Sequence, residues 1–263
     1  MQFNIHRFYL LMRKQLSENM RVYLMALAAL GFFWVILLTL ILSQGSGIDS
    51  QMEIFTIGFV FTGMLLAYHQ FKVLSNVPQS IRFLHLPASH LEKILLAVVL
   101  TLVIFPSLAV LVFYAVEIPI VEGFRKQFAR LPEVQKNLKI LPINMLKEPL
   151  KTIFFFLPFM VLGGIYFKKN ALIKTALLVM GLLIGVEILN MQLIKWLIDA
   201  PENTTLSGSF FESLFVNNTE NFEQDILKLP KNLSYCLNIF TWYLTPVFFW
   251  VLAWFRLKET EVA

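Results

Sequence analysis

The chain has 263 residues, of which 57% are hydrophobic and 15% are charged. Soluble domains typically carry about 25% charged residues, so this composition suits lipid better than water. The formal net charge of +5 does not indicate a nucleic-acid partner, because the Lys and Arg residues stand in short clusters beside apolar blocks and form no continuous basic face. We therefore expect one membrane domain over residues 1–263.

The first 22 residues are expected to form an amphipathic helix that lies on the membrane surface. Over residues 3–21 the polar positions Asn4, Arg7, Lys14, Glu18 and Arg21 share one helical face, and Ile5, Phe8, Met12, Leu16 and Met20 spread over the other. Charged residues precede the first apolar block, whereas a cleavable signal peptide has an apolar core soon after its start. The segment is therefore expected to stay on the mature protein.

Long apolar blocks predict the membrane spans. A bilayer core about 30 Å thick requires about 20 apolar residues in a helix, because every backbone polar group must be satisfied within the protein. Six blocks meet or approach this length, namely residues 24–42, 54–71, 94–116, 152–167, 175–194 and 235–255. Pro106, Pro158 and Pro246 interrupt three of them, and we expect helix kinks there. The predicted fold is all-α, with six transmembrane helices.

The distribution of basic residues predicts the orientation. With both termini in the cytosol, the cytosolic segments contain 12 Lys or Arg and 4 Asp or Glu, a net charge of +8. The external segments then contain 10 basic and 12 acidic residues, a net charge of −2. This split follows the positive-inside rule, so both termini are expected to be cytosolic.

Two long external loops follow from this topology, over residues 117–151 and 195–234. In the first loop, Phe124, Phe128 and Leu131 recur at the spacing of a short amphipathic helix. In the second, residues 201–225 are rich in Asn, Ser and Glu and are expected to form an irregular loop.

The cytosolic connection between spans two and three has a pattern of its own. Val77, Ile81 and Leu84 recur at i, i+4 and i+7, and Pro78 occupies a helix-start position, so a short helix with one apolar face is predicted over residues 77–86. Ser89 and Glu92 then match a capping box for the third span. The segment is either a plain connector or an apolar face for the groove of a partner.

Span five carries an ionisable residue, Glu187, near its middle. A carboxylate at that depth is costly, so it is expected to face protein or water. With Asn190 one turn further on, it either braces helices through a hydrogen bond or lines a substrate or proton pathway; a misplaced span boundary is the third interpretation. Gly181 and Gly185 form a Gly-x-x-x-Gly face that allows a helix to approach closely.

Sequence motifs give no indication of catalysis. The chain contains no phosphate loop, no HExxH or Cys/His metal spacing and no GxSxG turn. The single cysteine, Cys236, excludes an internal disulfide and a cysteine-based metal site. We therefore expect neither an enzyme nor a bound metal or cofactor in this chain.

Three strings carry a resemblance to a known family. They are Phe83-Leu-His-Leu-Pro-Ala-Ser-His-Leu-Glu-Lys93, Tyr166-Phe-Lys-Lys-Asn-Ala-Leu-Ile-Lys174 and Phe255-Arg-Leu-Lys-Glu-Thr-Glu-Val262. With the surface helix and the six spans, they make the chain resemble the membrane-spanning permease subunits of ABC-2-type ABC transporters, in a bacterial branch of the family. The resemblance covers nearly the whole length.

The resemblance implies a dimer of permease chains, identical or different, in a prokaryotic cytoplasmic membrane. It also implies separate cytosolic ATPase subunits, which hold ATP and Mg and drive transport, with export expected. The family's coupling helix would fall within residues 77–86, where Arg82, Phe83 and Leu84 would contact the ATPase, and Glu187 and Asn190 would shape or brace the pathway. The family's short re-entrant helices would correspond to residues 209–216. The alternatives are a structural or assembly protein without transport and a membrane enzyme.

Cysteine scanning tests the predicted topology. We expect an impermeant maleimide added to intact cells to label single cysteines at Glu122 and Asn217, but not at Arg82 or Lys169, in a Cys236→Ser background. The physical reason is the difference in net charge between the two sides. Labelling of position 82 from outside would contradict the arrangement of six spans with cytosolic termini.

Overall fold

The structure is a computed structural model, and it describes residues 4–45, 47–71, 88–128, 138–167, 170–198, 205–209, 213–217, 224–228 and 231–262. The helices are α1 (Ile5–Ser43), α2 (Ile48–Phe71), α4 (His90–Val99), α5 (Phe105–Gln127), α7 (Lys147–Tyr166), α8 (Ala171–Ile198), α9 (Lys231–Ile239) and α10 (Thr245–Val262). A 3₁₀ turn, η3 (Ile143–Leu146), precedes α7, and two π-helical turns, η2 (Leu100–Ile104) and η4 (Phe240–Leu244), join α4 to α5 and α9 to α10.

The chain is a helical multi-pass membrane protein. Within the described residues, four helical stretches are long and apolar enough to cross a membrane, namely Ile5–Ser43, Ile48–Phe71, Leu91–Gln127 and Ile143–Tyr166. They contain the first four predicted spans. The fifth and sixth predicted spans are helical too, in α8 and in α9–η4–α10. The total of six crossings and the cytosolic side of the termini remain predictions.

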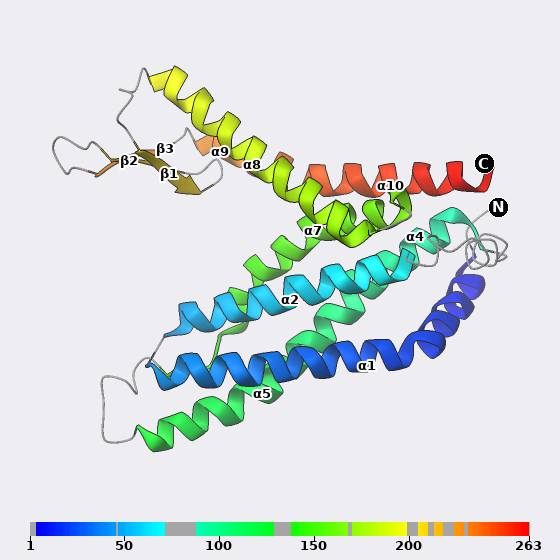
Figure 1. Cartoon of the computed structure of the whole chain (residues 1–263), viewed down its shortest axis with the longest axis horizontal. Helices are drawn as coiled ribbons and strands as arrows, with labels where there is room; N and C mark the ends of the chain where they lie inside the picture. Colours follow the sequence, from blue (N-terminus) through cyan, green and yellow to red (C-terminus); the bar gives the residue numbers. More distant parts are fainter. Residues whose placement is uncertain are drawn as a thin grey trace.

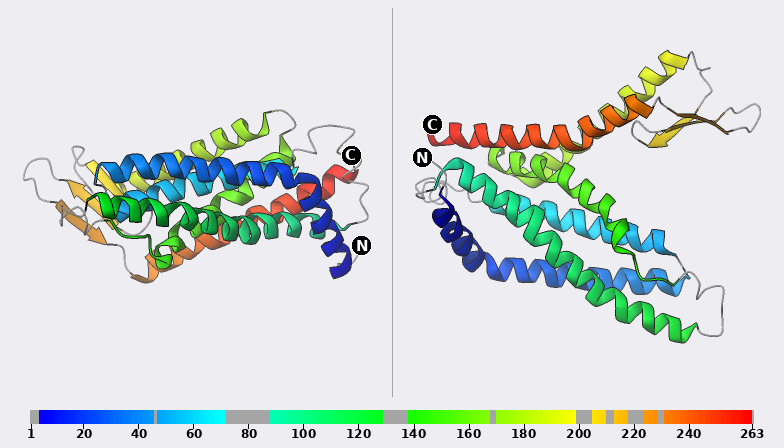
Figure 2. Two further views of the ribbon diagram at one scale, coloured as in Figure 1. Left: turned by 90° about the horizontal axis from the view of Figure 1, so that it is seen from below. Right: turned by 180° about the vertical axis from the view of Figure 1, so that it is seen from behind.

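The helices run back and forth so that both ends of the chain lie at one end of the bundle (Figure 1). We call this the termini end. At this end α2 finishes and α4 begins, and α7 also finishes and α8 begins here (Figure 1). α7 holds the bundle together, because it packs against α2 on one side and against α8 and α10 on the other. The N-terminal part of α1 departs at an angle from the rest of that helix (Figure 2).

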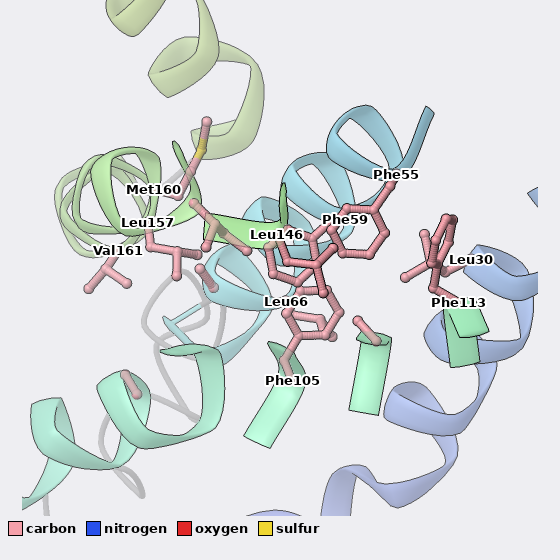
Figure 3. Close-up of a cluster of buried hydrophobic side chains, with 14 of the residues drawn as sticks. Leu30, Phe55, Phe59, Leu66, Phe105, Phe113, Leu146, Leu157, Met160 and Val161 are labelled. Carbon is pink, nitrogen blue, oxygen red and sulfur yellow. The ribbon is translucent and has the colours of Figure 1, made fainter. Parts of the chain in front are cut away.

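The core is built around the buried side of α2. Phe55 and Phe59 are stacked with ring centroids 5.1 Å apart, and they meet Phe113 and Phe105 of the next span (Figure 3). Trp34 of α1 stacks on Phe55 at 5.5 Å. Lipid is as apolar as these rings, so close packing rather than water exclusion holds helices together in a bilayer. On the α7 side, Leu157, Met160 and Val161 complete the cluster.

Of the three prolines at which kinks are expected, Pro106 and Pro246 follow π-helical turns, whereas Pro158 lies inside α7, which continues through it as an α-helix. The N–H of Phe105 bonds to the carbonyl of Leu100, and the N–H of Thr245 bonds to that of Phe240, so each bond spans five residues instead of four. Proline has no N–H and its ring collides with the carbonyl four residues earlier. A single wide turn before the proline relieves that collision and keeps the helix continuous.

The second predicted loop contains β-strands between residues 205 and 228, where an irregular loop was expected. The strands form an antiparallel sheet of β1 (Thr205–Ser209), β2 (Ser213–Asn217) and β3 (Gln224–Lys228), in that order. Phe215 pairs with Ser207 on one side and with Ile226 on the other. The suggested re-entrant helix at 209–216 is therefore wrong, and the all-α class holds only outside this sheet. Leu214, Phe215 and Val216 form a short apolar run with strong strand preference, and it is too brief for a stable helix.

The first predicted loop is shorter than expected. α5 continues to Gln127, eleven residues beyond the predicted end of the third span at residue 116, and η3 begins at Ile143. Phe124 and Phe128 therefore lie at the end of a long helix and not in a separate one. They stack at 6.0 Å and pack on Leu42, Val121 and Leu138. Charged residues after residue 116 ended the apolar run but did not end the helix.

Substitution of Gly163 by Ala is expected to weaken the packing of α7 on α8. A Cβ at this glycine would lie 2.7 Å from the Cβ of Thr175. Thr175 is fixed, because its hydroxyl donates a hydrogen bond to the Ala171 carbonyl at 2.7 Å. Overpacking of this kind costs about 1–3 kcal/mol, so Tm in detergent should fall.

Gly123→Ala on α5 is the matched control, because a Cβ there would meet nothing within 4 Å. Its Tm should be unchanged or higher, since Ala favours a helix more than Gly does. Equal Tm values for the two variants would contradict the tight contact between α7 and α8.

Candidate functional site

Glu92 joins the first turns of two helices at the termini end. Its side chain has no exposed surface. Its Oε1 accepts hydrogen bonds from the backbone N–H of Asn4 at 2.8 Å and from Nη2 of Arg7 at 3.3 Å. Its Oε2 accepts the backbone N–H of Ser89 at 2.8 Å, and the Ser89 hydroxyl accepts the N–H of Glu92 at 3.2 Å. The predicted capping box is confirmed, and the same carboxylate also holds the start of α1.

The electrostatics of this contact favour a negative charge. The first N–H groups of a helix lack partners within the helix and carry a partial positive charge. Here the N-termini of α1 and α4 both meet the Glu92 carboxylate, and the Arg7 guanidinium adds a full charge. The sequence motif identified Glu92 only as a cap of its own helix, because its contact with residues 4 and 7 spans more than 80 positions.

α1 and the α4–α5 span also make an apolar contact, next to the Glu92 contact. Leu11 of α1, Leu96 of α4 and Leu100 of η2 form a buried cluster. Partly buried neighbours add to it, namely Phe8, Met12, Leu16, Ala88 and Ile104. Three residues expected to face the membrane, Phe8, Met12 and Leu16, thus pack on the α4–α5 span. The N-terminal helix is continuous with the first span and docked on the third.

The three strings that carry the family resemblance meet at the termini end. Glu92 belongs to the first string. Tyr166, from the second, lies under the guanidinium of Arg256, from the third, with the guanidinium carbon 5.0 Å from the ring centroid. Arg256 also bonds to Glu259 at 2.7 Å, and α10 packs against α4 and α7. Segments far apart in the chain therefore build one surface around both termini.

Three polar residues at the opposite end, one of them fully buried, were missed by the sequence analysis. Glu117 is fully buried and accepts the N–H of Leu141 at 2.7 Å through Oε1. Tyr114 donates to the Leu141 carbonyl at 2.9 Å, and Arg125 donates to the Leu138 carbonyl at 2.7 Å. These three side chains hold residues 138–141 along α5. Their spacing on one helical face was the available signal, but the loop boundary placed at residue 117 concealed it.

Some polar atoms at this end have no hydrogen-bond partner among the described residues. They are Oε2 of Glu117 and both amide atoms of Gln51 on α2, and both residues are fully buried. Within the described ranges, no group of three His, Cys, Asp or Glu residues could hold a metal ion. We assign no ligand to this end.

Gly181 and Gly185 lie on an open face of α8, whereas Glu187 lies about 160° from Gly185 around the helix. A Cβ on Gly181 or on Gly185 would meet nothing within 4 Å, so these glycines do not pack against another helix among the described residues. The expected close approach of a helix at these glycines stays a prediction, because α8 meets α7 through a different face, at Thr175 and Val179. Glu187 is exposed, and the side chain of Asn190 lies outside the description.

The predicted coupling residues Val77, Ile81, Arg82, Phe83 and Leu84 fall in residues 72–87, which lie outside the described part of the chain. The structure describes the residues that flank this segment on both sides. Phe71, which ends α2, is buried, and Ala88 packs on the Leu11 cluster. The end of α2 and the start of α4 lie at the termini end (Figure 1).

An apolar groove runs between α1 and α2, along residues 26–33 and 57–65. It encloses about 310 Å³, and Phe33, Phe61, Ile57 and Leu65 are among its lining residues. Gly58 allows α1 and α2 to approach closely beside the groove, because a Cβ on this residue would lie 2.7 Å from the indole nitrogen of Trp34. A groove with this lining can hold an apolar group but offers almost no polar partner.

No protein-family model matches the chain, and searches of the curated proteins and of the solved structures likewise find no match.

Replacement of Glu92 by Gln tests the contact at the termini end. The variant keeps the shape but loses the charge that faces Arg7 and two helix N-termini. Hydrogen bonds to charged groups are worth about 1.5–3 kcal/mol each, and we expect a net loss of about 1–2 kcal/mol at this site near the surface. The N-terminal part of α1 should loosen, so trypsin should cleave at Arg7 and Arg13 faster than in the wild type.

Glu122→Gln, at an exposed position of α5, is the matched control and should leave cleavage unchanged. Cleavage of Glu92→Gln at the wild-type rate would show that apolar packing alone holds the N-terminal helix.

Proposed function

We propose that this chain is the permease subunit of an ABC-2-type ABC transporter. It moves a substrate across the cytoplasmic membrane, in the direction of export, while a separate ATPase subunit binds and hydrolyses ATP with Mg. The observation that carries the proposal is the gathering of the three family-like strings, with both chain ends, at one end of a helical membrane bundle. A shared surface of this kind suits a cytosolic partner.

The connection over residues 72–87 is the proposed contact with the ATPase. Its two ends are anchored in the bundle at Phe71 and at Ala88, and the Glu92 carboxylate follows immediately. A displacement of this segment by a partner would act on α2, on α4 and, through Glu92, on α1. Such rigid attachment on both sides is what transmission of motion from an ATPase to membrane helices requires.

The open face of α8 is the proposed contact with a second permease chain. Gly181 and Gly185 leave room for a helix to approach closely, and Glu187 on the same helix is exposed in a single chain. A carboxylate within a membrane span normally faces protein or a water-filled path and not lipid. A dimer would supply that environment, with Glu187 and Asn190 beside the pathway between the subunits.

Charge substitution in the coupling segment tests the proposal. We expect Ile81→Asp and Leu84→Asp to leave the permease folded but to abolish co-purification of the ATPase, because a buried apolar anchor is typically worth about 2 kcal/mol or more. The measurement is detergent pull-down with the phosphate-loop ATPase encoded by a neighbouring gene. Gel filtration checks that the permease is intact.

Ile143→Asp is the matched control, because this isoleucine is 75% exposed and lies on η3, before α7, away from the coupling segment. It should recover the ATPase like the wild type. Equal recovery by all three variants would show that residues 77–86 are only a connector, and it would favour a structural or assembly role without transport.

A further inference from the structure

The docking of the N-terminal helix changes which of its faces is free. Phe8, Leu11 and Leu16 are turned toward the α4–α5 span. Three other apolar side chains remain outside, with Ile5 76%, Tyr9 52% and Met20 53% exposed. With about 100° between successive residues of a helix, these three fall within about 60° of one another, and the stripe overlaps the edge of the packed face at Leu16.

Basic side chains border this free face. Arg13, which is exposed, adjoins the stripe about 20° from Met20 around the helix. Arg21, also exposed, and Lys14, half-buried, follow about 100° and 120° beyond Met20. Among the described residues, neither Arg13 nor Arg21 forms an ion pair, and Lys14 reaches only Glu18, at 3.9 Å. Residues 5–21 therefore present a positive charge next to an apolar stripe.

The Glu92 contact fixes the rotation of the helix. Asn4 and Arg7 are held at one end by the carboxylate, and Leu11 is buried against Leu96 and Leu100 one turn later. The helix cannot turn its packed face toward lipid without breaking both contacts. The stripe of Ile5, Tyr9 and Met20 is thus presented in a fixed direction. It lies in the N-terminal part of α1, which runs at an angle to the rest of that helix (Figure 2).

We infer that this face binds the surface of the bilayer and selects anionic lipids. Ile5, Tyr9 and Met20 enter the headgroup region, and Arg13, Lys14 and Arg21 pair with lipid phosphates beside them. The charge complementarity carries the choice of partner, because an apolar stripe with a basic border matches an anionic lipid surface. The assignment keeps Ile5 and Met20 from the apolar face that the sequence predicted, adds Tyr9 and removes Phe8, Met12 and Leu16, which pack on the α4–α5 span. It does not depend on transport.

Fluorescence in nanodiscs tests the inference on the full chain. A probe is attached to Tyr9→Cys in a Cys236→Ser background, and the nanodiscs contain either phosphatidylcholine alone or phosphatidylcholine with phosphatidylglycerol. Lipids with a spin label near the headgroup should quench the probe, more strongly in the anionic discs. Salt at about 1 M should remove the difference, because it shortens the screening length to about 3 Å.

Two further variants make the result specific. Arg13→Gln with Arg21→Gln should remove the dependence on lipid charge, whereas Lys139→Gln with Lys147→Gln, at the opposite end, should preserve it. A probe at Ser17, on the polar flank, should be quenched less than the probe at position 9. Equal quenching in the two kinds of disc would overturn the inference. A probe at position 9 that the lipids do not quench would also overturn it. The same holds if that probe becomes shielded only when the ATPase is added, because the face would then bind the ATPase and not lipid.

Discussion

Close packing of aromatic rings around α2 is the interaction on which the rest of the structure depends. Trp34, Phe55, Phe59, Phe105 and Phe113 join the first three predicted spans through ring contacts of 4.7–5.5 Å. In lipid, helices are not pressed together by water, so dispersion across such fitted surfaces has to hold them. Once α2 is fixed on α1 and α5, its other side receives α7, and α7 in turn carries α8 and α10.

Polar groups are used where the helices end. A helix terminus leaves backbone groups without partners, and a membrane protein must satisfy them internally or at the water surface. At the termini end, one carboxylate, Glu92, satisfies the starts of two helices. At the other end, Glu117, Tyr114 and Arg125 do the same for the returning residues 138–141. The two ends are thus closed by the same device, a side chain of one span that binds the backbone of another segment.

The proposed functions share the termini end. The coupling segment would bind an ATPase there, and the N-terminal helix would bind anionic lipid beside it, with the Glu92 contact between them. Binding or movement of either partner would therefore displace the start of α4. The open face of α8 lies on a different part of the bundle, which would let a second permease chain bind without displacing the ATPase.

Sequence alone determined the membrane class, the helical nature of all six predicted spans, the capping box and the distortions next to Pro106 and Pro246. These follow from local properties, namely apolar length, side-chain spacing and the missing N–H of proline. Only the tertiary structure decided which face of each helix is buried, because that choice depends on the neighbouring helix. It turned Phe8 and Leu16 away from lipid, left Gly181 and Gly185 open, continued α5 past Glu117 and paired three short strands where a loop was expected. Each of these results depends on contacts between residues distant in the chain, which composition and periodicity do not specify.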